Sequence, residues 1–209
     1  MDKYTPQNMV RLSRYADYFP TLENSVQKQI YDRIEELLEE NREYCDKGNA
    51  KHMAAIVTSI AMYETFQENG MTEEEAFRIV SEEMWKSIHP EKMQKMSTKS
   101  WFLPFMKVIV PFGFKKGSGK GWRYTWHKEE DPKDRFHFEC NECLYSYMFS
   151  KYNVKKLGPM YCYADVINYG NFPTIDFRRS KTLCRGDDCC NFDFVVMGSD
   201  KGWERTKSV

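Results

Sequence analysis

Hydrophobic residues in the first half of the chain recur every three or four positions, which is the period of a helix with one buried side. Residues 22–44 follow this pattern with Glu and Arg on the opposite side, and residues 51–67 repeat it. A third such segment starts at Thr72, whose side chain can cap the helix while Glu75 bonds back to it. The predicted buried positions of this third helix are Phe77, Val80, Met84 and Ile88.

Hydrophobic and polar residues alternate in the second half, which is the period of a strand with one buried face. Four segments share this pattern and pair as two hairpins: residues 122–126 with 136–140, and residues 175–178 with 191–196. The second hairpin is closed by a predicted turn, RGDD, in which Gly186 supplies a positive φ. Two short helices are predicted between the hairpins, at residues 143–152 and 159–169.

These elements predict an α+β fold, in which a helical N-terminal half precedes a mainly antiparallel sheet of four strands. The sheet consists of two hairpins with two short helices between them, and helices cover its apolar face. The length of 209 residues suits a single domain with a core of its own. We divide that domain, residues 1–209, into a helical part (1–96), an apolar junction with a basic loop (97–121), a hairpin–helix–hairpin core (122–197) and a polar tail (198–209).

The junction contains the longest apolar run, residues 101–114, which has 14 residues, two prolines and one lysine. A membrane span needs about 20 apolar residues, so the run predicts no integral membrane segment. We interpret it as a buried segment, with a lid over a pocket or a surface for lipid or a partner as alternatives. The basic loop after it is not a phosphate loop, because five residues rather than four separate Gly113 from Gly119 and Gly121 replaces the hydroxyl residue.

Charge and cysteine content narrow the function classes. The 31 basic and 31 acidic residues give zero formal net charge, which argues against a nucleic-acid partner, since such proteins need a basic excess or a basic face. The start of the chain has no apolar signal region and no small-residue cleavage site. Because the seven cysteines are also an odd number, we predict a cytoplasmic protein with mostly reduced thiols.

Six of the seven cysteines lie in the last 70 residues, at positions 140, 143, 162, 184, 189 and 190. Zinc binding is one interpretation, because two pairs have the spacing of structural zinc sites. The alternative metal set is therefore Cys140, Cys143, Cys184 and Cys189. Against zinc, Cys189 and Cys190 are adjacent on a strand and face opposite ways, so at most one of them can join a given site.

Two other interpretations of the cysteines stay open. Free cysteine is among the most buried residue types, and Cys140 and Cys190 share strand faces with phenylalanines. Alternatively, one thiol is a nucleophile, which needs a base or a cation nearby. The candidate partners for such a thiol are His137, Glu142, Asp165 and Arg179.

Three pieces of the C-terminal half occur in a fixed order: FHFECNEC at 136–143, CYAD at 162–165 and IDFRRSKTLCRGDDCCNF at 175–192. Their order and spacing resemble the L-2-amino-thiazoline-4-carboxylic acid hydrolase family, over about residues 122–197. The matching positions are Cys162 and Asp165 in a Cys-x-x-Asp motif, Arg179 and Thr182 after a strand, Gly186 in a turn, and Cys190 with Phe192 at the end. Helix register favours Cys143 over Cys140 as the family's first cysteine, and Asn191 stands where the family has Asp.

The resemblance implies a hydrolase that opens a cyclic amidine, converting L-2-amino-thiazoline-4-carboxylate to N-carbamoyl-L-cysteine or acting on a related small substrate. The catalytic residues that it implies are Cys143, Cys162, Asp165, Cys190 and His137. Arg179 and Thr182 are the implied substrate-binding residues, because a guanidinium suits a carboxylate. No cofactor is implied, and zinc is the alternative. An amide cannot accept a proton as a carboxylate does, so Asn191 predicts an altered or inactive member if the family's Asp is catalytic.

The same C-terminal pattern is also similar to small-ligand-binding domains of the vinyl-reductase type. That similarity implies a non-enzymatic alternative, a sensor or carrier module that holds a small ligand. Both interpretations imply a small-molecule partner, and neither sets an oligomeric state.

Overall fold

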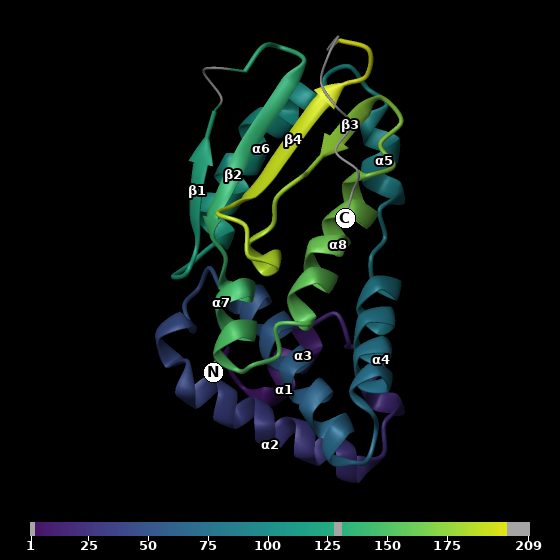
Figure 1. The fold of residues 1–209 in the computed structure, drawn as a ribbon, viewed down its shortest axis with the longest axis vertical. Helices are drawn as coiled ribbons and strands as arrows, with labels where there is room; N and C mark the ends of the chain where they lie inside the picture. The colour runs from purple at the N-terminus through teal and green to yellow at the C-terminus, as the bar shows by residue number, and fades with distance from the viewer. Residues whose placement is uncertain (1–2, 128–130, 200–209) are drawn as a thin grey trace. The chain divides into compact units, whose positions relative to one another are not determined.

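The computed structural model describes residues 3–127 and 131–199 of the chain (Figure 1). This part contains eight α-helices, three short 3-10 helices and four strands. They group into two compact units: residues 1–87, 117–120 and 144–158 form the first, and residues 88–116, 121–143 and 159–209 form the second. The polar tail predicted at 198–209 lies outside the described residues after Ser199, and residues 128–130 of the first hairpin turn do so too.

The first unit is helical. Its α-helices are α1 (Pro6–Leu12), α2 (Asn24–Glu40), α3 (Ala50–Glu68), α4 (Glu73–Lys86) and α7 (Leu144–Lys151), with the 3-10 helices η1 (Phe19–Thr21) and η2 (Arg42–Tyr44). The three helices predicted from the hydrophobic periodicity are confirmed. The helix α3 packs against α1, α2 and α4, and most of its circumference is buried. The capping box of α4 is confirmed as well, because Thr72 and Glu75 exchange side-chain-to-backbone hydrogen bonds of 3.3 and 2.9 Å.

The second unit holds the sheet. Its strands are β1 (Arg123–Trp126), β2 (Arg135–Glu142), β3 (Ile175–Arg178) and β4 (Cys190–Val196). The helices of this unit are α5 (Glu91–Ser97), α6 (Phe102–Gly117), most of α8 (Leu157–Tyr169) and the 3-10 helix η3 (Leu183–Arg185). The strand order is β1-β2-β4-β3 and every pairing is antiparallel (Figure 1). The two predicted hairpins therefore join through β2 and β4, and the predicted α+β class is confirmed.

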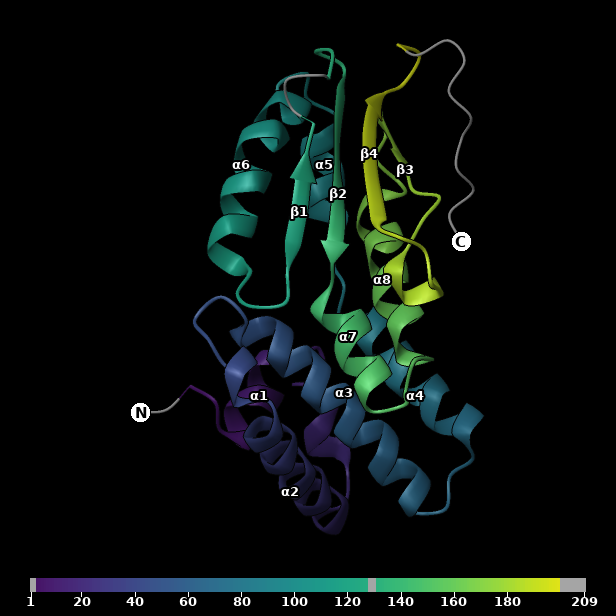
Figure 2. The ribbon, with the colours of Figure 1, turned by 60° about the vertical axis from the view of Figure 1, so that its left-hand side comes forward.

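One face of the sheet, which we call the inner face, carries the core of the second unit. The register places Phe136 opposite Phe194 and Phe138 opposite Phe192, so the apolar positions of β2 and β4 lie on the same face. Helix α6 lies along the sheet beside β1 (Figure 2). The buried core residues are Phe102, Leu103, Met106, Phe136, Phe138, Phe172, Ile175 and Phe194. The intervening strand positions lie on the opposite face, which we call the outer face.

The predicted junction with a basic loop at residues 97–121 is wrong over most of its length, because residues 102–117 form the helix α6. Pro104 fits the first turn, where backbone N–H groups have no partner within the helix, but Pro111 lies inside the helix. Only one side of α6 is buried, so the interpretation as a buried segment holds for half of it. In the part of the chain that the structure describes, none of the helices combines the length and the hydropathy needed to cross a membrane.

The connection between β3 and β4 is longer than the tight RGDD turn that we predicted. It covers residues 179–189 and contains η3, so the two strands do not close directly on each other. The predicted positive φ of Gly186 is confirmed, at 93°. Glycine adopts this left-handed conformation without the steric penalty that a Cβ brings, which lets the chain reverse directly after η3.

Candidate functional site

Five cysteines from distant parts of the sequence meet at one end of the inner face. Their side chains interact in a chain of pairs, from Cys140 to Cys143, then to Cys184, Cys162 and Cys190. All five are free thiols. We call this group the thiol cluster, and it lies entirely within the second unit. The cluster therefore brings together five of the six cysteines in the last 70 residues of the sequence.

The strand pattern explains two members of the cluster. Cys140 follows Phe136 and Phe138 at two-residue spacing on β2, so it lies on the inner face. The antiparallel register places Cys140 directly opposite Cys190, the first residue of β4. Both are buried. Cys143 comes directly after the end of β2, and it extends the cluster beyond the sheet.

The connection between β3 and β4 brings in Cys184, and polar side chains hold that connection in place. The amide oxygen of Asn191 accepts the backbone N–H groups of Ser180 and Lys181, at 3.0 and 2.8 Å. The carboxylate of Asp187 accepts the N–H of Thr182 at 2.7 Å. Cys184, on η3, is thereby brought to the cluster. The N–H of the preceding residue, Leu183, is 3.2 Å from the sulfur of Cys190 and donates to it.

Helix α8 supplies Cys162 and Asp165, which lie three residues apart on one side of the helix. The guanidinium of Arg179 fixes both of them to the sheet: one nitrogen is 2.7 Å from the Asp165 carboxylate, and another donates to the backbone carbonyl of Cys162. The guanidinium also stacks over the rings of Phe177 and Phe192, at 5.5 and 5.4 Å. Arg179 is only 5% exposed, so it is a fixed positive charge inside the cluster.

This arrangement favours the thiolate form of Cys162. Hydrogen bonds from the thiols of Cys184 and Cys190 are the largest causes, and the charge of Arg179 and the side chain of Thr182 add to them. Together they outweigh burial and lower the pKa of Cys162 to about 3. The thiolate is the nucleophilic form of cysteine, so Cys162 is the thiol of the cluster whose surroundings best suit a nucleophile.

The surrounding thiols are held in the protonated form. The pKa of Cys184 is raised by its contacts with Cys143 and Cys162 and by burial. The pKa of Cys190 is raised by its contact with Cys162 and by burial, and that of Cys140 by its contact with Cys143 and by burial. The cluster therefore holds one sulfur anion among neutral S–H donors.

Asp165 is the carboxyl group that interacts with that anion. Burial and the negative charge of Cys162 outweigh the attraction of Arg179 and raise the pKa of Asp165 to about 6. Its side chain is nevertheless 30% exposed, so the carboxyl group is in contact with solvent. A carboxyl group with this pKa can donate and accept protons near neutral pH.

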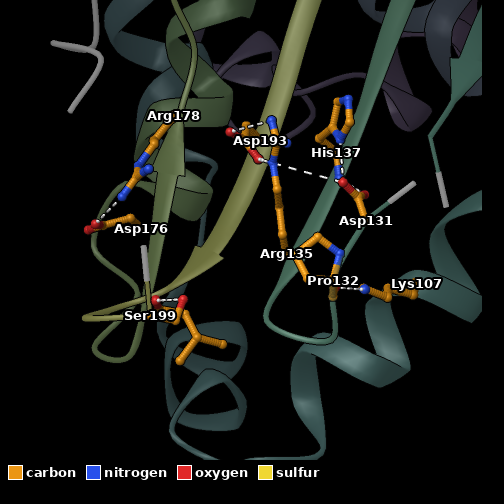
Figure 3. Close-up of polar contacts among 10 residues, drawn as sticks. Lys107, Asp131, Pro132, Arg135, His137, Asp176, Arg178, Asp193 and Ser199 are labelled. Carbon is orange, nitrogen blue, oxygen red and sulfur yellow. Dashed lines mark hydrogen bonds and ion pairs between the residues drawn. The ribbon is translucent and has the colours of Figure 1, made fainter. Parts of the chain in front are cut away.

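His137 is not brought to the cluster. It lies between Phe136 and Phe138 on β2, so its side chain is on the outer face. There it stacks on His127, with ring centroids 4.1 Å apart, and its backbone N–H donates to Asp131 at 2.7 Å (Figure 3). Its implied catalytic role is therefore not supported by its position. Among the other implied residues, Cys143, Cys162, Asp165, Cys190, Arg179 and Thr182 all lie in or beside the cluster.

The alternative zinc set is not assembled. Cys189 interacts with Glu139 and Asp188, which together with burial raise its pKa, and it is not one of the contacts of the thiol cluster. Across residues 3–127 and 131–199, no group of three or more His, Cys, Asp or Glu side chains has an arrangement that could hold a metal ion. The prediction that adjacent cysteines cannot share one site agrees with the separation of Cys189 from Cys190.

Sequence reasoning missed the part that Cys184 has in the reactive group. We considered it only as a zinc ligand, although it is the thiol with the largest effect on the pKa of Cys162. Its position six residues before Cys190, across a glycine turn, was the available signal. That spacing lets the chain reverse and bring Cys184 back to the start of β4.

Comparison with known proteins identifies a family. The sequence model described as L-2-amino-thiazoline-4-carboxylic acid hydrolase matches residues 49–194, which is more than half of the chain and includes every residue of the thiol cluster. No curated protein and no solved structure gave a significant match.

Proposed function

This chain belongs to the L-2-amino-thiazoline-4-carboxylic acid hydrolase family, and we propose that it hydrolyses a small cyclic amidine with Cys162 as the nucleophile. The proposed substrate class is a five-membered ring in which one carbon is bonded to sulfur and to two nitrogens. The thiazoline carboxylate in the family's name is the first substrate to test. The single observation that supports this proposal is the thiolate of Cys162 beside a protonatable Asp165.

The overall reaction adds one water molecule and opens the ring. The carbon between sulfur and nitrogen gains an oxygen, its bond to the ring sulfur breaks, and that sulfur leaves as a thiol. For the thiazoline carboxylate the product is N-carbamoyl-L-cysteine. No electrons are transferred, so the reaction needs a nucleophile and proton transfer but no oxidant or reductant.

In the proposed first step, the sulfur of Cys162 attacks the amidine carbon, and the bond from that carbon to the ring sulfur breaks. The leaving sulfur takes a proton from Asp165, which is then a carboxylate. In the second step that carboxylate accepts a proton from water as the water attacks the same carbon, and Cys162 leaves as the thiolate. A nucleophile and an acid–base group on adjacent turns of one helix fit this sequence of transfers.

Arg179 has a different role in this proposal from the one that the resemblance implied. Two of its nitrogens are already bonded to Asp165 and to the carbonyl of Cys162, and its side chain is buried. We therefore assign it as a positioning residue that fixes α8 against the sheet and stabilises the Cys162 thiolate. Thr182 also interacts with Cys162 and favours the same thiolate.

In this proposal Asn191 is a structural residue rather than a catalytic one. Its side-chain oxygen accepts two backbone N–H groups, and its amide nitrogen donates to the hydroxyl of Ser180 at 3.1 Å. An Asp carboxylate has an equivalent oxygen, so either residue can hold the connection between β3 and β4. The proposal therefore does not require a carboxylate at this position.

The test is to incubate the purified full chain with the thiazoline carboxylate and to follow the product by mass spectrometry, as a gain of one water molecule. We expect turnover by the wild type and none above background by a Cys162→Ala variant. Cys189→Ala is the matched control, because this cysteine is buried but lies outside the thiol cluster, and it should retain turnover. Turnover that persists in the Cys162→Ala variant contradicts the proposal. Binding of the substrate without turnover by the wild type favours the ligand-binding alternative.

A further inference from the structure

Helix α6 exposes an apolar side to solvent, and the proposed hydrolase activity makes no use of it. The side chains concerned, with their exposed fractions, are Trp101 (51%), Phe105 (44%), Val108 (63%), Ile109 (41%) and Phe112 (53%). We call these five the α6 patch. Single exposed apolar residues are ordinary, but a contiguous group of large ones marks an interaction site.

The spacing of the α6 patch shows that it is one surface. Trp101 directly precedes α6, and its carbonyl accepts the N–H of Phe105 at 3.0 Å. The members follow each other at intervals of four, three, one and three residues, which keeps them on one side of the helix. The opposite side of α6, with Phe102, Leu103 and Met106, packs into the core on the inner face of the sheet. A helix that is apolar on both sides normally has both sides covered. We therefore expect a second apolar surface to cover the exposed side of α6.

The charge around the patch indicates which kind of partner surface it fits. Between residues 92 and 116 the chain has no Asp or Glu and has lysines at positions 92, 95, 99, 107, 115 and 116. The chain as a whole has zero formal net charge, so this segment is a local excess of positive charge. Lys115 and Lys116 lie in the last turn of α6, and the ammonium of Lys116 is 4.3 Å from the ring centre of Phe112.

We propose that the α6 patch binds to an anionic lipid surface, with α6 lying in the plane of the interface. Tryptophan and phenylalanine insert at the boundary between lipid headgroups and acyl chains, and neighbouring lysines bind the anionic headgroups. A second copy of this chain is a poorer occupant, because two lysine-rich segments would then face each other. The patch is separate from the thiol cluster, so lipid binding is independent of the hydrolase activity.

The test is co-sedimentation of the full chain with vesicles of phosphatidylcholine alone or of phosphatidylcholine with phosphatidylserine. We expect binding to the vesicles that contain phosphatidylserine, weaker binding as the salt concentration rises, and little binding to phosphatidylcholine alone. A Lys115→Gln/Lys116→Gln variant should bind about 25-fold more weakly, since each lysine near such a surface contributes about a fivefold factor. Lys47→Gln/Lys51→Gln is the matched control, because it removes two exposed lysines elsewhere and should bind as the wild type does.

A second variant tests the apolar part of the proposal. Replacing Trp101, Phe105 and Phe112 by alanine should weaken binding by more than about tenfold and leave the circular dichroism unchanged, because these side chains are largely exposed. Equal binding by this variant and the wild type overturns the proposal. The proposal is also overturned if the wild type binds neither kind of vesicle. If the wild type then dimerises in sedimentation velocity and the triple variant does not, the α6 patch binds a second copy of the chain instead.

Discussion

The two faces of the sheet carry different kinds of polar group: the inner face carries a cluster of thiols, and the outer face carries a network of paired charges. At one end of the inner face, the thiol cluster holds a sulfur anion at Cys162 and a carboxyl group with a raised pKa at Asp165. On the outer face, we define the ion network as Asp131, Arg135, His137 and Asp193 (Figure 3). Strands β2 and β4 contribute to both groups, at alternating positions.

The ion network consists of direct, mutually satisfied contacts. Two nitrogens of Arg135 bind the two carboxylate oxygens of Asp193, at 2.9 and 3.2 Å. The carboxylate of Asp131 accepts both the backbone N–H and the ring nitrogen of His137. On β3, Arg178 pairs with Asp176 at 3.1 Å. Each carboxylate here has a donor at hydrogen-bond distance, which is the arrangement expected of a structural group.

The thiol cluster lacks that balance. One thiolate there is stabilised by neutral thiols as well as by Arg179, while Asp165 is held close to it in spite of the repulsion between their charges. Buried charge alone therefore does not identify a functional site, because the outer face also buries carboxylates. On the inner face, the pKa of Cys162 is lowered and that of Asp165 is raised, toward the forms that the proposed reaction uses.

The largest effect that we predict is a loss of stability when the ion network of the outer face is broken. We expect Asp193→Ala to lower the free energy of unfolding by about 3 kcal/mol, because it removes the two hydrogen bonds of the partly buried Arg135 and leaves it only the more distant carboxylate of Asp131, at 3.9 Å. Urea denaturation measures this change. The hydrolase activity of the folded variant should remain.

A double variant, Arg135→Met/Asp193→Leu, serves as the control for that prediction. It removes both charges and should lie within about 1 kcal/mol of the wild type. If Asp193→Ala leaves stability unchanged but abolishes ring opening, the ion network is part of the active site and the contrast fails.

The second expected effect is on the alkylation of Cys162. An ordinary thiol reacts with iodoacetamide about 80-fold more slowly at pH 6 than at pH 8, because its thiolate is depleted. The pKa of Cys162 lies near 3, so its rate should hardly change over this range. Peptide-resolved mass spectrometry measures the rate, and protein unfolded in urea should regain the ordinary dependence. A rate at Cys162 that falls in parallel with that of an ordinary thiol rules out the thiolate.

The third expected effect is on the pH dependence of ring opening. Asp165 acts as an acid, and its pKa is raised to about 6, so the reactive protonated form is lost as the pH rises through 6. Below that pH the Cys162 thiolate persists until about pH 3, so the rate does not fall until then. We expect kcat/KM to decline about 16-fold between pH 6 and pH 7.5. Asp165→Asn should remove this decline along with most of the rate, and a wild-type rate that rises with pH would exclude Asp165 as the acid.

The smallest expected effect is that of Asn191→Asp. The new carboxylate can accept the same two N–H groups from the connection between β3 and β4. We expect kcat/KM to change less than about threefold, in the range of an exchange between equivalent acceptors. A large gain in activity would show instead that a carboxylate at this position takes part in the chemistry. The active site would then include a residue of the outer face.

Local patterns predicted the fold well because the decisive forces in these elements are local. Two-residue alternation identified the four strands, and a capping box located the start of α4. The helix α6 was missed because its prolines and glycine disfavour a helix locally, while packing against the sheet outweighs that preference. The length of the connection between β3 and β4 was missed because it depends on hydrogen bonds from Asn191 and Asp187, which a sequence does not reveal.

The candidate site was predictable in its residue types but not in its pairings. Order and spacing indicated Cys162, Asp165 and Cys190, which do come together. The same alternation that identified β2 already placed His137 on the other face from Cys140, so the sequence held the reason to leave it out. Which thiol carries the charge depends on the distances from Arg179 and Cys184, and these follow only from the three-dimensional register.

The connection between β3 and β4 is secured at a few backbone points rather than by a packed core. Arg185 lies between those points and faces solvent, next to the reactive group but outside the sheet. The exposed positions of this connection can therefore change without disturbing the pairing of the strands, whereas Cys184 and Thr182, which contact Cys162, cannot change without altering the reactive group.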